Sequence, residues 1–157
     1  MGAPSVHYLC KSLIIENTCF SEFSEYADKD YCRFYCIIIQ YSTSYAGHKL
    51  FKFLRGLKNP PLPKKMYHFR LAEEKESIAL TGYEHNAICP FGMKYEMPYV
   101  LSERISHFQD SYIWLGGGDV NLKLGIKVNQ FIEICKPYVV DITHPDYIEK
   151  DFTNPIF

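Results

Sequence analysis

A lysine interrupts one of the most apolar stretches of the chain. Lys11 lies between Cys10 and the apolar residues 13–15, in a segment that predicts a β-strand over residues 8–16. Burying an unpaired ammonium group is costly, so the Lys11 side chain must reach either solvent or a site. An outward lysine on an edge strand and a ligand-binding lysine are both consistent with these residues.

Two loops contain residues that allow the backbone to approach a ligand closely. Residues 83–93 form a long loop with His85 and Asn86, and residues 116–119 form a Gly-Gly-Gly-Asp turn between two predicted strands. A backbone N–H in such a loop can stabilise a developing oxyanion. The simpler interpretation is an ordinary loop and a tight turn, because neither segment has the context of a phosphate-binding nucleotide motif.

The six cysteines do not indicate a metal site or a catalytic thiol. No CxxC pair exists, and no histidine lies three to five residues from another. Cys89 precedes Pro90, but no base can be assigned to it. We therefore expect buried, reduced thiols, and we find no Ser-His-Asp or Cys-His arrangement.

Basic side chains are concentrated in one part of a nearly neutral chain. The net charge is −1, yet no Asp or Glu occurs between Tyr31 and Ala72. This region is either a solvated surface or a patch that contacts phosphates. Its candidate phosphate contacts are Lys49, Lys52, Arg55, Lys64 and Lys65.

The length of 157 residues suits a single domain, spanning residues 1–157. The apolar runs are too short to span a bilayer, and the first nine residues do not resemble a signal peptide, so we expect a cytoplasmic protein.

The pattern of apolar and polar residues predicts strands over 8–16, 32–41, 67–71, 97–101, 112–115, 121–126 and 138–142, and helices over 45–57, 72–80 and 128–136. This order predicts an α+β fold, with a curved, mostly antiparallel mixed sheet and helices packed on it.

Three segments together resemble a known family. They read LCKSLII at residues 9–15, LTGYEHNAICPFGM at 80–93 and WLGGGDVNLKL at 114–124. The first resembles the strand that carries the functional lysine of the YbaK/prolyl-tRNA-editing family. The second is similar to the glycine-and-proline loop of that family, and the third to its late glycine turn.

The resemblance implies an aminoacyl-tRNA deacylase, which hydrolyses the ester between an amino acid and the terminal ribose of a mischarged tRNA. Lys11 would then pair with the phosphate of the terminal nucleotide, and the backbone at Asn86 and Ala87 would act in catalysis. No cofactor or metal is implied. The expected substrate-binding residues are His85, Ile88, Pro90, Gly116, Gly117, Gly118, Asp119 and Asn121.

The same resemblance implies a trans-editing enzyme for a tRNA such as tRNA-Pro bearing Ala or Cys, with an aminoacyl-tRNA synthetase as a further partner. Two features differ from the family pattern. Asn86 replaces the first glycine of the loop, although Asn tolerates a positive φ angle better than other non-glycine residues. The family's N-terminal helix is missing or shortened before Lys11. These differences leave a non-catalytic tRNA-binding or synthetase-associated module as the alternative.

Overall fold

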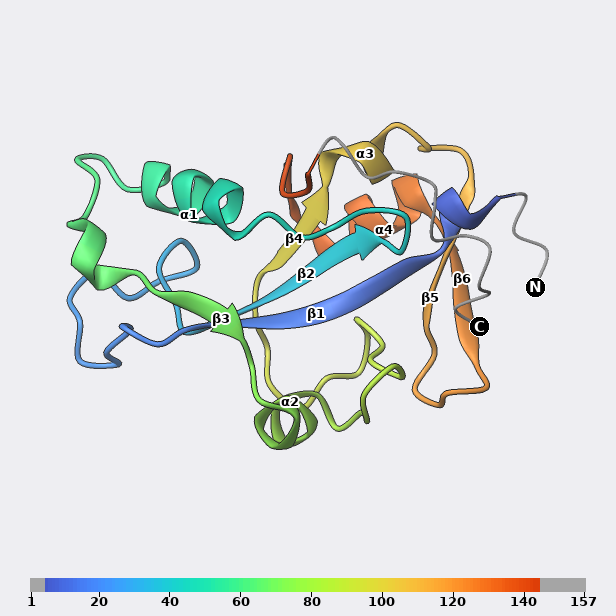
Figure 1. The fold of residues 1–157 in the computed structure, drawn as a ribbon, viewed down its shortest axis with the longest axis horizontal. Coiled ribbons are helices and arrows are strands. Elements are labelled where there is room, and N and C mark those ends of the chain that lie inside the picture. Colours follow the sequence, from blue (N-terminus) through green and yellow to red (C-terminus); the bar gives the residue numbers. More distant parts are fainter. Residues whose placement is uncertain (1–4, 145–157) are drawn as a thin grey trace.

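The computed structural model describes residues 5–144, which form a five-stranded sheet and a two-stranded hairpin (Figure 1). The sheet contains β1 (Cys10–Asn17), β2 (Phe34–Gln40), β3 (Phe69–Leu71), β4 (Tyr99–Ser102) and β7 (Tyr138–Val140), and the hairpin joins β5 (Tyr112–Gly116) to β6 (Lys123–Lys127). The order in the sheet is β3-β1-β2-β4-β7. β1 is antiparallel to β2 and β3, whereas β4 is parallel to β2 and β7.

Helices cover the sheet on both sides, which confirms the predicted α+β class. The helices are α1 (Gly47–Gly56), α2 (Glu74–Thr81), α3 (Glu103–Ser106) and α4 (Val128–Cys135), with 3-10 turns η1 (Val6–Tyr8) and η2 (Lys64–Met66). None of the helices in the described part of the chain is long and apolar enough to cross a membrane.

The central strand β2 is buried along its whole length, as its run of isoleucines predicts. On one face, Ile37 and Ile39 belong to a cluster with Leu50 and Leu54 of α1. On the opposite face, Ile38 belongs to a cluster that includes side chains of α4 and of the β5–β6 hairpin. The sheet therefore separates α1 from the hairpin.

The long loop that follows α2 lies on the same side as the hairpin. Gly82 ends α2 in the left-handed conformation with φ +80°, and its N–H donates to the Ile78 carbonyl at 2.8 Å. The chain then runs between α2 and β5 before it enters β4 (Figure 1). This path brings residues 83–93 close to the first half of β1.

The first half of β1 is open on the side that faces this loop. β3 is only three residues long and pairs with residues 15–17 of β1. On that side, residues 10–13 have no strand partner within the described range 5–144. Lys11 therefore lies on a locally exposed strand edge, where a cavity can form beside it.

Two features of the fold differ from the sequence prediction. The prediction missed α3, because a helix of four residues has too few turns to produce a periodic pattern. It also favoured hairpins, whereas β4 and β7 lie parallel to their neighbours. Parallel pairing needs a long crossover, which the loops and helices between β2 and β4 provide.

Candidate functional site

A small cavity lies where the open edge of β1 meets the loop after α2. Its volume is about 50 Å³. Four separate segments of the chain contribute to it: β1, the end of β2, the loop and the end of β5. The lining residues are Lys11, Ser12, Leu13, Tyr41, His85, Asn86, Ile88 and Gly116. The cavity thus brings together five residues that the sequence analysis predicted from three distant segments.

The Lys11 side chain extends along an aromatic ring at the cavity. Lys11 pairs with Ile39 of β2, and its Nζ lies 5.5 Å from the centroid of the Tyr41 ring. Such a cation–π contact stabilises an ammonium that has lost part of its water. Partial burial lowers the pKa of Lys11 below its ordinary value. Lys11 is therefore a partly desolvated cation at the cavity.

The loop beside Lys11 adopts the conformation that the sequence predicts for Asn86. Asn86 has φ +65°, a left-handed conformation that Asn tolerates better than other non-glycine residues. The Ala87 N–H donates to the Glu84 carbonyl at 3.0 Å, which closes a tight turn. The N–H groups of Asn86 and Ile88 have no hydrogen-bond partner within residues 5–144. They are better placed than the Ala87 N–H to donate to a ligand.

Two tyrosines hold the rest of this loop. The Tyr83 hydroxyl donates to the Phe91 carbonyl at 2.6 Å, and the Tyr99 hydroxyl donates to the Pro90 carbonyl. Pro90 is buried and does not line the small cavity. Pro90 was predicted to contact substrate. In the structure it is buried, and its carbonyl fixes the loop to Tyr99.

The glycine turn packs against this same loop. A Cβ atom on Gly116 would lie 2.3 Å from the Ile88 carbonyl oxygen. Gly118 has φ +94°, and its N–H donates to the Ala87 carbonyl at 2.9 Å. Gly117 closes the hairpin by donating to the Leu122 carbonyl at 3.2 Å. Of the three glycines, only Gly116 lines the cavity, and all three position the backbone around it.

The two polar residues that follow this turn lie at the tip of the hairpin. The Asp119 carboxylate accepts a hydrogen bond of 2.8 Å from the Asn121 N–H, and both residues are exposed. Neither residue lines the cavity. Their visible role is to stabilise the turn, because an Asp side chain often bonds to the backbone two residues on.

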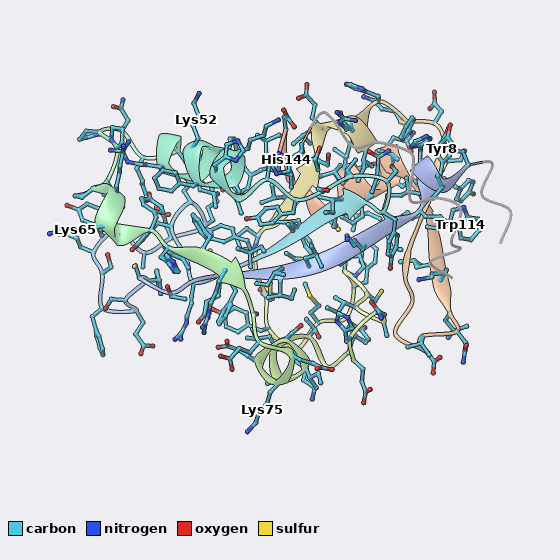
Figure 2. The ribbon with its side chains drawn as sticks, viewed as in Figure 1. Tyr8, Lys52, Lys65, Lys75, Trp114 and His144 are labelled. Atoms are coloured by element: carbon cyan, nitrogen blue, oxygen red, sulfur yellow. The ribbon has the colours of Figure 1, made fainter. Side chains whose placement is uncertain are left out.

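The basic residues that were predicted to contact tRNA differ in their surroundings. Lys49 Nζ lies 2.6 Å from an Asp141 carboxylate oxygen, and Arg55 Nε donates to the Leu62 carbonyl at 2.9 Å. Lys52, Lys64 and Lys65 are exposed and form no ion pair with any other described residue. Figure 2 shows Lys52 and Lys65 pointing outward from α1 and η2. α1 lies across the sheet from the Asn86 loop.

Burial keeps several thiols protonated. Burial raises the pKa of Cys10 and Cys36 far above the ordinary value, and it raises the pKa of Cys32 and Cys135 to about 11. No three His, Cys, Asp or Glu side chains of the described residues gather closely enough to hold a metal ion. The polar side chains that line the small cavity belong to Lys11, Ser12, Tyr41, His85 and Asn86.

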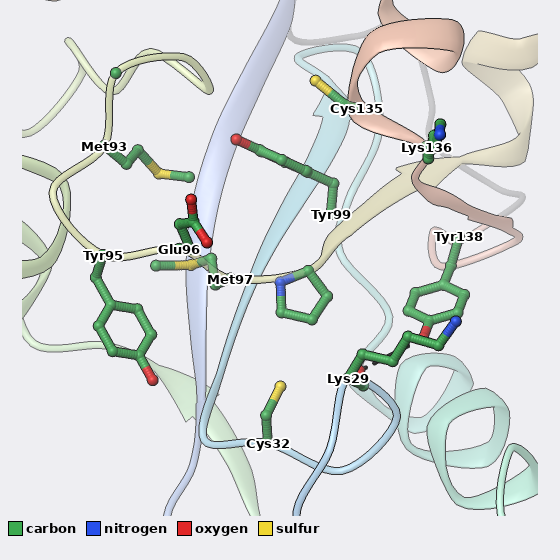
Figure 3. A pocket seen from close by; sticks show the side chains of 12 residues that line it. Lys29, Cys32, Met93, Tyr95, Glu96, Met97, Tyr99, Cys135, Lys136 and Tyr138 are labelled. Carbon is green, nitrogen blue, oxygen red and sulfur yellow. Dashed lines mark hydrogen bonds between the residues drawn. The ribbon is translucent and has the colours of Figure 1, made fainter.

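A larger cavity lies at the opposite end of β2 and contains none of the predicted site residues. Its volume is about 820 Å³. Figure 3 shows Tyr95, Tyr99, Tyr138 and two methionines around it. The same loop borders both cavities, since residues 85–88 reach the small one and residues 92–98 reach the large one. Size alone would therefore select a different site from the one that the motifs indicate.

Three residues of the small cavity, Ser12, Leu13 and Tyr41, were not predicted from the sequence. Tyr41 lies two residues beyond Ile39, the antiparallel partner of Lys11. An explicit pairing of the two predicted strands would have placed Tyr41 close to Lys11. Nothing in the sequence marks Ser12 as a site residue, because a serine within a strand most often has no functional role.

Comparison with known proteins supports the predicted fold. The family model of the aminoacyl-tRNA editing domain matches residues 63–134. A crystal structure described as a proposed trans-editing enzyme for prolyl tRNA synthetase has a TM-score of 0.68 at 16% identity, over 89% of this chain and 73% of that chain. Hypothetical protein APE2540 has a TM-score of 0.67 at 19% identity, over 89% and 77% of the two chains. A search of curated proteins found no match.

Proposed function

We propose that this chain, in which residues 63–134 match the family model of the aminoacyl-tRNA editing domain, hydrolyses the ester of a mischarged tRNA. The observation that carries the proposal is the cavity that joins Lys11 to the positive-φ Asn86 loop. An amino-acid ester is already activated, so its hydrolysis needs binding, a polarised carbonyl and a placed water more than a strong base.

In this proposal Lys11 binds the phosphate of the terminal nucleotide as a point charge. The ammonium already lies at the cavity mouth beside Tyr41. The ester carbonyl would face the N–H groups of Asn86 and Ile88, which donate to the oxyanion as it forms. One such donor typically contributes about 3–4 kcal/mol to transition-state stabilisation. The tRNA hydroxyl next to the ester would assist the water, as the family resemblance implies.

The size of the cavity favours a small amino acid. A cavity needs about 10–15 Å³ on this measure to hold one water molecule, so a cavity of about 50 Å³ admits only a few heavy atoms. Alanine, cysteine and serine meet this limit better than larger residues. We therefore propose Ala- or Cys-tRNA-Pro as the class of substrate. A solved protein of the same fold is described as acting for prolyl tRNA synthetase, and such a synthetase is the partner we propose.

A deacylation assay tests this function. Purified protein would be mixed with tRNA-Pro charged with Ala, Cys, Ser or Pro, and with tRNAs carrying these amino acids correctly. We expect release of one small, wrongly attached amino acid and no release of Pro from tRNA-Pro. If no amino acid leaves any tRNA while tRNA binding persists, the chain is a binding module and not a deacylase.

Asn86 offers a test of what limits the pocket. Asn86→Gly should keep the fold, because glycine adopts φ +65° without strain, and should enlarge the cavity by removing a side chain from its wall. We expect the ratio of kcat/KM for Thr-tRNA to that for Ala-tRNA to rise about 5- to 30-fold, as about 1–2 kcal/mol of steric discrimination is lost.

Asn86→Ala is the matched control for this prediction. It also shortens the side chain, but it strains the left-handed backbone by roughly 1–2 kcal/mol. We expect lower thermal stability and lower activity toward every substrate. An unchanged preference in Asn86→Gly would show that the pocket wall lies elsewhere.

The exposed lysines of α1 and η2 are proposed to contact the tRNA backbone. Simultaneous replacement of Lys52, Lys64 and Lys65 by Gln should weaken tRNA binding and flatten its dependence on salt. Each lost phosphate contact reduces the slope of log K against log salt by about 0.9. Fluorescence titrations over a range of salt concentrations measure that slope. Lys49→Gln should change it little, because Lys49 already pairs with Asp141.

A further inference from the structure

The ring of Tyr41 contacts two lysine side chains from different strands. Lys11 Nζ is 5.5 Å from the ring centroid, and Lys123 Nζ is 5.8 Å from it. Lys11 belongs to β1, Tyr41 follows the last residue of β2, and Lys123 begins β6. Three elements that are far apart in the sequence thus bring two ammonium groups to one aromatic ring.

Lys123 lies near the small cavity. In the β5–β6 hairpin Lys123 pairs in register with Gly116, which lines that cavity. The cavity lining contains no Asp or Glu. Within residues 5–144 neither Lys11 nor Lys123 takes part in an ion pair. Two cations are therefore held close to one pocket without a carboxylate to balance them.

A buried hydroxyl in the cavity also lacks a partner. Ser12 is only 6% exposed, and its Oγ forms no hydrogen bond with any described residue. A buried polar atom without a partner is rare, and a bound ligand is one way to satisfy it. The cavity lining thus contains Lys11 and an unpaired hydroxyl at Ser12. Both an ammonium and a hydroxyl can donate hydrogen bonds to an anion with several oxygen atoms.

We propose that Lys123 and Lys11 together bind the phosphate that joins the terminal adenosine of tRNA to the rest of the strand. This inference rests on the proposed function and adds Lys123 as a second phosphate-binding residue. An amino acid in ester linkage has no free carboxylate, so the phosphate is the anion that this end of the substrate presents.

The test compares two uncharged tRNAs, one complete and one shortened by its terminal adenosine and the phosphate attached to it. Wild-type protein should bind the shortened tRNA more weakly. Lys123→Met should lose about tenfold in affinity for the complete tRNA and nothing for the shortened one. Lys123→Arg keeps the charge and the contact with the ring, and it should restore most of the loss.

Lys127→Met is the matched control. Lys127 lies at the other end of β6, and its Nζ is 5.9 Å from the Tyr112 ring, so it makes the same type of contact away from the cavity. It should leave both affinities unchanged. If Lys123→Met weakens both tRNAs equally, or neither, the two-lysine phosphate site is wrong.

The binding readout separates this inference from the proposed function. If wild-type protein releases no amino acid yet Lys123→Met selectively loses the complete tRNA, the phosphate site stands and the deacylase proposal fails. If wild-type protein deacylates and Lys123→Met behaves like wild type, the deacylase stands and the phosphate site fails.

Discussion

Lys11→Met should lower kcat/KM for deacylation by about 10- to 100-fold, because a charge-assisted contact to phosphate is worth about 1.5–3 kcal/mol. Methionine keeps an unbranched stem of similar length and removes only the charge. Most of the loss should appear in KM if the phosphate is bound equally in the ground state and the transition state. Initial-rate kinetics with the preferred aminoacyl-tRNA measure both constants.

The same variant should be as stable as wild type or more stable. Burial lowers the pKa of Lys11 in the folded protein below its value in the unfolded chain. Between those two pKa values the unfolded chain binds more protons, so stability rises with pH across that window. At neutral pH, below the window, the desolvated ammonium opposes folding, and Lys11→Met removes this effect. Thermal denaturation at neutral and alkaline pH should show the advantage of the variant shrinking as pH rises.

Lys127→Met is the control for Lys11→Met, because it removes a lysine that also contacts a tyrosine ring outside the cavity. Its kinetics should match wild type. If Lys11→Met retained full activity, the proposed role of Lys11 in substrate binding would be wrong. A large loss of stability in Lys11→Met would instead assign the lysine a structural role.

Gly116→Ala should remove most of the deacylase activity, because it displaces the backbone around the cavity. The new Cβ would lie 2.3 Å from the Ile88 carbonyl oxygen and 3.1 Å from the Ala87 carbonyl carbon. Both are backbone atoms, so no side-chain rotation can relieve the overlap, and either the end of β5 or the Asn86 loop must shift. A displacement of about 1 Å at a reacting centre can cost about 100-fold in rate. Overpacking of this kind also costs about 1–3 kcal/mol of stability.

Gly56→Ala is the control, because an added Cβ atom at Gly56 would not overlap with neighbouring atoms. Gly56 ends α1, and no atom lies within 4 Å of a Cβ built there. We expect unchanged kinetics and stability that is equal or higher by up to about 1 kcal/mol, since alanine favours the helix. A Gly116→Ala protein with wild-type kinetics and melting temperature would mean that the contact between β5 and the loop does not hold the site.

Features that depend on local conformation could be predicted from the amino-acid sequence. The apolar run around residues 34–40 predicted a strand buried on both faces, and all seven residues of β2 are buried. Asn86 was expected to tolerate a positive φ angle, and it has φ +65°. These features follow from steric preferences and hydrophobic periodicity, which act over a few neighbouring residues.

Which distant residues meet became clear only from the folded protein. Three contacts each join segments at least 28 residues apart: Gly116 with the Ile88 carbonyl, Lys49 with Asp141, and the Tyr41 ring with Lys11 and Lys123. Such contacts depend on the order and register of the strands, which local preferences do not specify. The sequence could name Lys11 and Asn86 as candidates, but the folded sheet edge was needed to place them around one cavity.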